Sequence, residues 1–448
     1  MTAIATNSFK KTVIDRIIDN IGDSGGNYYL AIGKSDQWNT TETVPTTVNT
    51  LEEERKFRSS MQSIKKISDG SFVATRYNWS SGTIYKAFSD AVTLTSLGAY
   101  YVYTESQRVY ICLEQGKDTS GNPVISTINP DTVGTGNIPS RTSDGYVWKY
   151  LFTLTAINTN KFLSANFLPV TKITTAGNLI ETEQLNVQNA AVKGSIVGYR
   201  IVSGGTDYPS SVTGTVIGNG SSAAVTLTVS GGSIVKAIIA DSTDGNLALG
   251  AGYNYASVSI TDSNNGAATI EPVISLNGIG ADPRDDINAR FLMMNSQPAG
   301  EEGGDFLVSQ DFRQIGILKN PKTHNDSDFT AGTGLVLRKL KLNSVTGTFA
   351  ADDLIRGNTS NAAAFVDKFD AATNTIFFHQ NANSGFKPFT SGEVVTDSDD
   401  AGVFGTLNAL DSDGEANPFS GEIIYIENKS PVTRDAAQTE DVKVIFQL

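Results

Sequence analysis

The 448-residue sequence contains few residues suited to metal binding or nucleophilic catalysis. It has one cysteine, Cys112, and two histidines, His324 and His379. A single cysteine excludes a disulfide framework within the chain, so a reducing compartment is compatible with it. Cys112 lies in the apolar run VYICLE, which predicts a small buried side chain in a strand. The histidines lie in different segments, so we expect neither a Ser-His-Asp triad nor a zinc site, and we expect His324 to be a solvated loop residue.

Basic clusters and long apolar runs are also scarce. Lys and Arg number 34 against 47 Asp and Glu, which gives a net charge of −13. Nucleic acid binding needs a basic face, and the chain offers only short basic groups such as Lys65 and Lys66, so we predict no nucleic acid partner. No apolar run approaches the roughly 18 residues that span a bilayer, and the start MTAIATNSFKK lacks the apolar core of a signal peptide. We therefore expect no membrane partner and no secretion signal.

Most of the common catalytic motifs are missing as well: there is no P-loop, HExxH or CxxC. The acidic clusters that could supply a glycosidase pair are Glu52-Glu53-Glu54, Asp285-Asp286 and Glu301-Glu302. The first begins a predicted helix, where the helix dipole favours acids, and the other two flank loops. Two Asp/Gly stretches, 241–245 and 411–414, begin like calcium loops but lack the glutamate that completes one, which favours tight turns. We predict that the protein is not an enzyme and has no cofactor or metal.

Small polar residues take the place of the missing charges. Charged residues make up 18% of the chain, below the usual share of about 25%, and Gly, Ser, Thr and Asn are abundant. This composition favours β structure with many turns. Two amphipathic helices are predicted: one at 9–21, and one that starts at a Thr50/Glu53 capping box and carries the stripe Phe57, Met61 and Ile64. The predicted strands are 28–32, 72–77, 100–103, 108–113, 146–152, 423–426 and 442–448.

Two of these strands have distinctive patterns. At 423–426 an unbroken apolar run predicts a strand covered on both faces and followed by a polar loop, whereas 442–448 alternates as a half-buried strand does. In DGYVWKYLF the aromatic side chains Tyr146, Trp148 and Tyr150 fall on one face. Strict alternation favours a packed sheet face, and a carbohydrate-stacking platform is the alternative.

Two segments differ from the rest of the chain in composition or in carrying internal repeats. At 193–280 the chain is rich in Gly, Ser, Thr and Val, and GGTDYPSSVTGTV resembles GAGYNYASVSI further along. At 333–410, FAADDLIRGNTSN is similar to FTSGEVVTDSDDA. Such internal repeats predict inserted β modules. We predict a mainly β fold with a few α-helices, a multi-domain β-sandwich-like core interrupted by two inserted all-β modules. The predicted parts are core 1–192, module 193–280, core 281–332, module 333–410 and closing strands 411–448.

Five stretches, in order, resemble a baseplate wedge subunit of contractile-tailed, T-even-like phages, the gene-product-eight family. They are the first helix with YYLAIGKSDQW; VATRYNW with VYICLE; SDGYVWKYLF; DFRQIGILKNP; and the final SGEIIYIEN with QTEDVKVIFQL. They cover about half of the chain, and the two modules are departures from the family pattern.

The resemblance implies a function that is mechanical. It implies a mostly β homodimer in the virion tail baseplate, assembled in the host cytoplasm and joined to other wedge subunits. Such a subunit holds the wedge together and transmits the rearrangement that leads to sheath contraction. The alternative is a receptor- or carbohydrate-binding tail protein with the inserted modules as binding heads.

Overall fold

The computed structural model describes residues 4–22, 27–261, 266–308, 310–408 and 412–447. Over these residues strands make up 40% and six α-helices 13% of the chain, so the prediction of a mainly β, multi-domain fold is confirmed. The chain forms two compact units: unit 1 holds 1–14, 71–293 and 445–448, and unit 2 holds 15–70 and 294–444. Within the described residues, no helix has the length and apolar character needed to cross a membrane.

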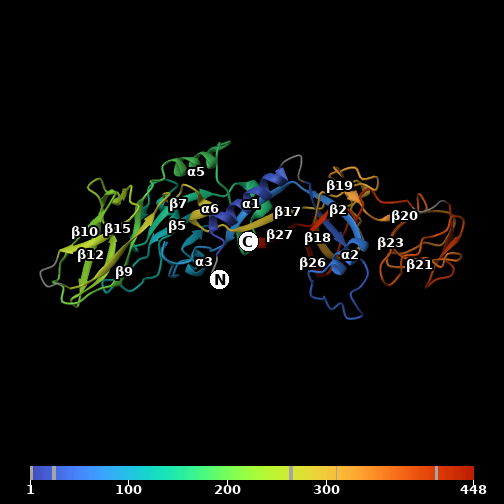
Figure 1. Cartoon of the computed structure of the whole chain (residues 1–448), viewed down its shortest axis with the longest axis horizontal. Helices are drawn as coiled ribbons and strands as arrows, with labels where there is room; N and C mark the ends of the chain where they lie inside the picture. The colour runs from blue at the N-terminus through green and yellow to red at the C-terminus, as the bar shows by residue number, and fades with distance from the viewer. Residues whose placement is uncertain (1–3, 23–26, 262–265, 309, 409–411, 448) are drawn as a thin grey trace. The chain divides into compact units, whose positions relative to one another are not determined.

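A five-stranded antiparallel sheet is the centre of unit 2 (Figure 1), in the order β19-β2-β1-β18-β26. Its strands are β1 (Tyr28–Gly33), β2 (Met61–Ile67), β18 (Asp311–Lys319), β19 (Thr333–Leu335) and β26 (Glu422–Thr433). Helix α2 (Leu51–Ser59) packs on it through Phe57, which is fully buried. Gly316 makes room for that ring, because a Cβ at this position would lie 2.6 Å from it.

The second helix is shorter than its predicted stripe. The Thr50 cap is confirmed, since the Thr50 hydroxyl accepts from the Glu53 backbone N–H at 3.2 Å. The reciprocal bond of a capping box is not formed, because the Thr50 N–H donates to the Val48 carbonyl instead of the Glu53 side chain. The helix ends at Ser59, however, and the predicted stripe residues Met61 and Ile64 lie in β2. The prediction was wrong here because β2 is an inner strand with both faces largely buried, so its apolar residues do not alternate.

The predicted environment of 423–426 was also wrong. β26 is an edge strand, Ile424 is 36% exposed, and the strand continues to Thr433 where a polar loop was expected. An edge position explains both differences, because one side of the strand needs no partner and the missing N–H of Pro431 then costs no ladder bond.

A closed six-stranded barrel fills the rest of unit 2 (Figure 1), in the order β20-β23-β22-β21-β24-β25. Its strands are β20 (Arg338–Thr346), β21 (Leu354–Gly357), β22 (Ala363–Asp370), β23 (Thr375–His379), β24 (Val394–Asp397) and β25 (Phe404–Leu407). The two repeats of the sequence form the hairpins β21–β22 and β24–β25. Phe349 and Phe389, which lead the repeats, are both buried in the barrel core.

The two hairpins pair with each other through β21 and β24, and the register of this pairing is symmetric with respect to the two repeats. β21 and β24 are antiparallel, and the paired residues are Ile355–Asp397, Arg356–Thr396 and Gly357–Val395. The repeat aligns Arg356 with Thr396, so the central pair joins equivalent positions. The hairpins are therefore related by a local two-fold axis at this pair.

Unit 1 is built around the aromatic strand β7 (Val147–Thr153). Its sheet has the order β4-β5-β7-β6, with β4 (Tyr101–Tyr103), β5 (Arg108–Glu114) and β6 (Ser140–Arg141). A second sheet has the order β27-β17-β3-β8, with β3 (Asp69–Thr75), β8 (Phe167–Val170), β17 (Phe291–Ser296) and β27 (Val442–Gln447). The remaining helices are α1 (Asn7–Gly22), α3 (Leu94–Leu97), α4 (Ala156–Phe162), α5 (Leu179–Asn189) and α6 (Pro283–Asp286), with 3-10 turns at Pro130–Val133 and Glu302–Gly304. Leu448, expected in the last strand, lies outside the described residues.

The segment 193–280 folds as four two-stranded ribbons, β9–β16, β10–β15, β11–β14 and β12–β13. The strands are β9 (Ser195–Ser203), β10 (Thr213–Gly218), β11 (Ser221–Ala223), β12 (Val225–Ser230), β13 (Ser233–Ile239), β14 (Leu249–Ala251), β15 (Ala256–Thr261) and β16 (Thr269–Ser275). Ser195 pairs with Ser275, which brings the two ends of the segment together. The barrel ends also meet, because Lys339 and Ser412 exchange backbone hydrogen bonds of 2.8 and 3.0 Å.

Candidate functional site

Three of the stretches that carry the resemblance are joined by side chains in unit 2. Their strands β1, β18 and β26 are neighbours in one sheet. The Arg313 guanidinium donates to the Ser35 carbonyl and, at 2.8 Å, to Glu42. Gln314 donates to the Asn428 side chain, and the Trp38 indole donates to the Lys429 carbonyl, both at 2.8 Å. The loop GKSDQW is therefore held in place by the FRQI and IEN stretches.

A buried histidine links this loop to the barrel. His379 Nδ1 lies 2.7 Å from Asp367 Oδ2, and its Nε2 lies 3.8 Å from Asp36 Oδ1. The Ser35 hydroxyl and the Gln62 amide also donate to Asp367, at 2.9 and 3.0 Å. Asp367 and His379 belong to the barrel, whereas Ser35, Asp36 and Gln62 belong to the sheet and its loop. We call these five residues the histidine clamp.

The charges of the clamp stabilise one another. Burial alone would lower the pKa of His379, but Asp367 and Asp36 raise it to about 10. Burial would likewise raise the pKa of Asp36, but the nearby His379 and Lys34 lower it to about 2. Lys34 lies 2.6 Å from Asp36. At neutral pH the clamp therefore contains an imidazolium between two carboxylates.

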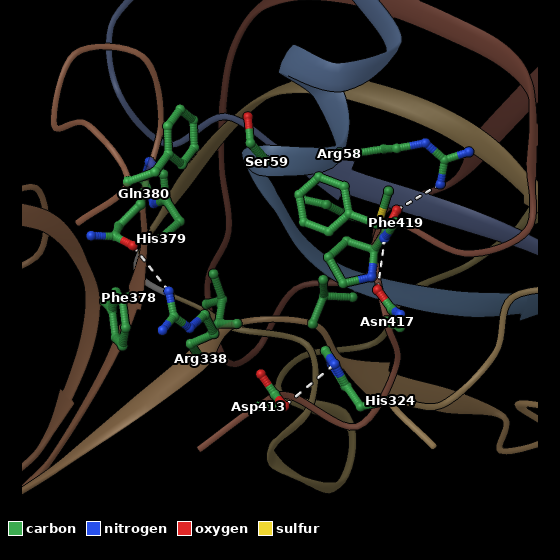
Figure 2. A pocket seen from close by; sticks show the side chains of 15 residues that line it. Arg58, Ser59, His324, Arg338, Phe378, His379, Gln380, Asp413, Asn417 and Phe419 are labelled. Atoms are coloured by element: carbon green, nitrogen blue, oxygen red, sulfur yellow. Dashed lines mark hydrogen bonds and ion pairs between the residues drawn. The ribbon is translucent and has the colours of Figure 1, made fainter. Parts of the chain in front are cut away.

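A half-open pocket of about 300 Å³ lies beside the clamp, between the barrel, the end of α2 and the loop 412–419 (Figure 2). Figure 2 shows Arg338 and Gln380 on one side of it and Arg58 with Phe419 on the other. Both histidines line this pocket, although they come from different segments of the sequence. His324 is an exposed loop residue, as predicted, and its side chain, which is 29% exposed, lies 3.5 Å from Asp413.

Two arginines carry the positive charge of the pocket. Arg58 donates to the carbonyls of Pro418, Ser420 and Gly421 at 2.6, 2.7 and 3.0 Å. Arg338 donates to Gln380 at 2.9 Å, and its guanidinium lies 5.1 Å from the centre of the Phe378 ring. Burial lowers the pKa of both arginines, and in Arg338 the carboxylate of Asp413 opposes that effect. Both side chains stay charged, because an arginine does not lose its proton in proteins.

Residues of all three acidic clusters form ion pairs or accept hydrogen bonds from the backbone. Glu52 pairs with Lys56, Glu301 with Lys368, and Glu302 with Lys65. Asp285 bonds to Lys11 and Arg290, each at 2.5 Å. Asp286 is buried, which raises its pKa to about 8, and it accepts from the Gly280 N–H at 2.7 Å.

The calcium-loop look-alikes give no metal site in the described residues. Asp244 accepts from the backbone and side chain of Asn246 at 3.1 and 2.9 Å, as in a tight turn. Asp411 lies outside the described residues, and Asp413 pairs with His324. Among the described residues, no three His, Cys, Asp or Glu side chains are grouped to hold a metal ion.

The aromatic strand is packed inside unit 1. Tyr146, Trp148 and Tyr150 are all 0% exposed, which confirms the packed sheet face and excludes the carbohydrate platform. The Tyr146 and Trp148 rings stack at 5.7 Å with an interplanar angle of 13°. Cys112 is buried in the same cluster, as predicted.

Comparison with known proteins adds no family to these observations. No protein-family model matches the chain, and no curated protein matches it. The resemblance to wedge subunits therefore depends on the five stretches themselves and on how they pair in the structure.

Proposed function

We propose that the protein is a structural subunit of a phage tail baseplate wedge, which holds wedge subunits together and transmits the rearrangement that leads to sheath contraction. The observation that supports this proposal is the pairing of the resembling stretches. YYLAIG in β1 pairs with FRQIGILK in β18, which pairs with EIIYIEN in β26. In unit 1, VYICLE in β5 pairs with YVWKYLF in β7.

Strands that are far apart in the sequence become neighbours, so the resembling residues form sheets rather than scattered surface segments. Side chains reinforce this arrangement, since Arg313, Gln314 and Trp38 bond across three of the stretches. Near the limits of the two repeat segments, which depart from the family pattern, Ser195 pairs with Ser275 and Lys339 pairs with Ser412. A framework of this kind suits a load-bearing subunit whose work is done through protein–protein surfaces.

Association in solution gives a first test. The family resemblance implies a homodimer, so sedimentation equilibrium at micromolar concentration should give twice the 47.6 kDa monomer mass. A monomer at all concentrations would contradict the dimeric part of the proposal.

The position in the virion gives the decisive test. A cryo-EM map of the tail particle should place the chain in the baseplate wedge, in contact with other wedge subunits. Density at a distal fibre or spike would instead support the receptor-binding alternative. Exposed aromatic residues in both modules favour that alternative: Tyr255 is 68% exposed in the first and Phe386 is 63% exposed in the second.

A further inference from the structure

We infer that the pocket of unit 2 is a docking site for a segment of a partner protein that carries a carboxylate next to a bulky apolar side chain. This inference is independent of the proposed function, because it follows from the shape and charge of the pocket alone.

The rim of the pocket is aromatic and exposed. Phe386 and Phe419 are each 63% exposed, while the apolar residues beneath them, Met61 and Leu337, are 2% exposed. Single exposed apolar side chains are common on protein surfaces, but two large rings at the edge of one cavity form a hydrophobic patch of the kind that marks interaction sites.

Polar residues of the same pocket hold the backbone beside both rings in place. Gln380 donates to the Lys387 carbonyl at 2.8 Å, which fixes the chain next to Phe386. Arg58 donates to the Pro418 carbonyl, and the Phe419 N–H donates to Asn417 at 2.9 Å. The backbone that carries the rings is therefore pre-positioned, and a partner would lose less free energy in ordering these segments.

The charge of the pocket opposes the charge of the protein. The chain as a whole is at −13, yet two guanidinium groups, Arg58 and Arg338, line this cavity together with one carboxylate, Asp413. An entering carboxylate would find complementary charge here, whereas most of the surface would repel it. Arg338 is the better anchor, because its side chain stacks on Phe378 at the cavity wall.

The size of the pocket and its residue types favour a protein segment as the occupant. A cavity of about 300 Å³ lies at the lower limit of ligand pockets and suits one bulky side chain with a neighbouring carboxylate. Aromatic and arginine side chains are also the residue types that dominate the binding energy of protein interfaces.

The test uses the full-length protein and an acetylated, amidated hexapeptide, Gly-Ser-Asp-Phe-Ser-Gly, with 4-fluorophenylalanine as the ring. ¹⁹F NMR titration should show saturable binding at millimolar concentration or better. The matched peptide with Asn in place of Asp should bind roughly tenfold more weakly, because a charge-assisted hydrogen bond contributes more than a neutral one. Equal binding of the two peptides, or no binding at all, overturns the inference.

Variants locate the binding. Arg338→Gln should remove the preference for Asp over Asn, and Phe419→Ala should weaken both peptides. Arg200→Gln, which changes an exposed arginine in unit 1, is the matched control and should leave binding unchanged. Phe419 is exposed, so Phe419→Ala should fold normally. If Arg338→Gln is unstable, Phe419→Ala still tests whether the peptides bind in this pocket. Binding of 4-fluorophenylacetate as tight as that of the peptide would overturn a protein segment as the occupant and indicate a small carboxylate.

Discussion

The two repeat-bearing segments bury their short strands in different ways. Among the described residues, the barrel core has 13 buried side chains and two partly buried ones packed against them. The ribbon module at 193–280 has nine buried side chains and 13 partly buried ones. The barrel closes on itself and has no open edge, whereas each ribbon pairs only two strands. We conclude that the barrel has a self-contained core and that the ribbon module depends more on its anchorage.

The anchors of the two segments also differ. The barrel is joined to its sheet by the histidine clamp, in which opposite charges are buried together. The ribbon module is held by Glu114, which accepts from the Ile239 N–H at 2.6 Å and from Arg141 at 2.8 Å. Burial raises the pKa of Glu114 in spite of the nearby Arg141. Keeping the Glu114 carboxylate charged therefore costs more free energy than keeping the mutually stabilised charges of the histidine clamp.

Excision should have the largest effect and should depend on where the cut is made. Replacing 340–411 by a short Gly/Ser linker should leave a folded remainder, because Lys339 and Ser412 are already paired. Replacing 333–410 should lower the melting temperature further, because it also removes β19, which pairs with β2 at Thr333 to Leu335. Circular dichroism melting of both variants gives the comparison, and equal melting temperatures would show that β19 contributes nothing to the sheet.

Truncation of a core side chain should have the second-largest effect, and the loss of stability should differ between the barrel and the ribbon module. Phe389→Ala removes a ring that is 3% exposed and packs edge-on against Phe378 at 5.8 Å, so it should destabilise the barrel by about 3–5 kcal/mol. Ile234→Ala in the ribbon module should cost about 2 kcal/mol, because its partly buried neighbours can relax around the gap. Urea unfolding followed by hydrogen exchange in each segment measures both losses. A larger loss in the ribbon module would reverse the comparison.

The histidine clamp should make the stability of unit 2 depend on pH. The pKa of His379 is about 10 in the folded protein and about 6.5 when unfolded. Its contribution is therefore complete below pH 6.5 and is lost as the pH rises through 10, at no more than about 1.4 kcal/mol per pH unit. His379→Gln should flatten this slope between pH 7 and 10 in denaturant unfolding. A slope identical to that of the parent protein would mean that the imidazole is neutral.

Loosening the ribbon anchor should have the smallest effect. Glu114→Gln keeps the shape of the side chain but weakens two charge-assisted hydrogen bonds, which should cost about 1–3 kcal/mol. The matched control is Glu271→Gln, which breaks an exposed pair with Arg200 and should cost less than about 1 kcal/mol. Hydrogen exchange at the Ile239 amide measures the loosening directly, and an unchanged rate in Glu114→Gln would remove this anchor from the comparison.

Local patterns in the sequence predicted individual helices and strands. The pairing of distant strands and the pocket depend on residues that lie far apart in the sequence, so they could not be predicted in this way. The repeats that start at Phe349 and Phe389 could be recognised because each contains its own turn and hairpin. The closure of the barrel by β20 and β25 could not, since those strands come from opposite ends of the segment.

The pocket was missed for the same reason. Arg58, His324, Arg338 and Phe419 belong to four separate stretches, and no motif connects them. No role was predicted for His379, and its charge depends on Asp36, which lies far away in the sequence. The one available signal was the GKSDQW loop, whose Ser35 and Asp36 meet the barrel.

The local two-fold of the barrel has a consequence for folding kinetics. Each hairpin closes through a short turn, and a hairpin forms within about 1–10 μs. The pairing of Leu342 with Leu407 must instead wait until the two ends of the segment meet, which costs more chain entropy. The barrel should therefore assemble from two hairpins that form early and almost identically, with its last seam at β20 and β25 setting the rate.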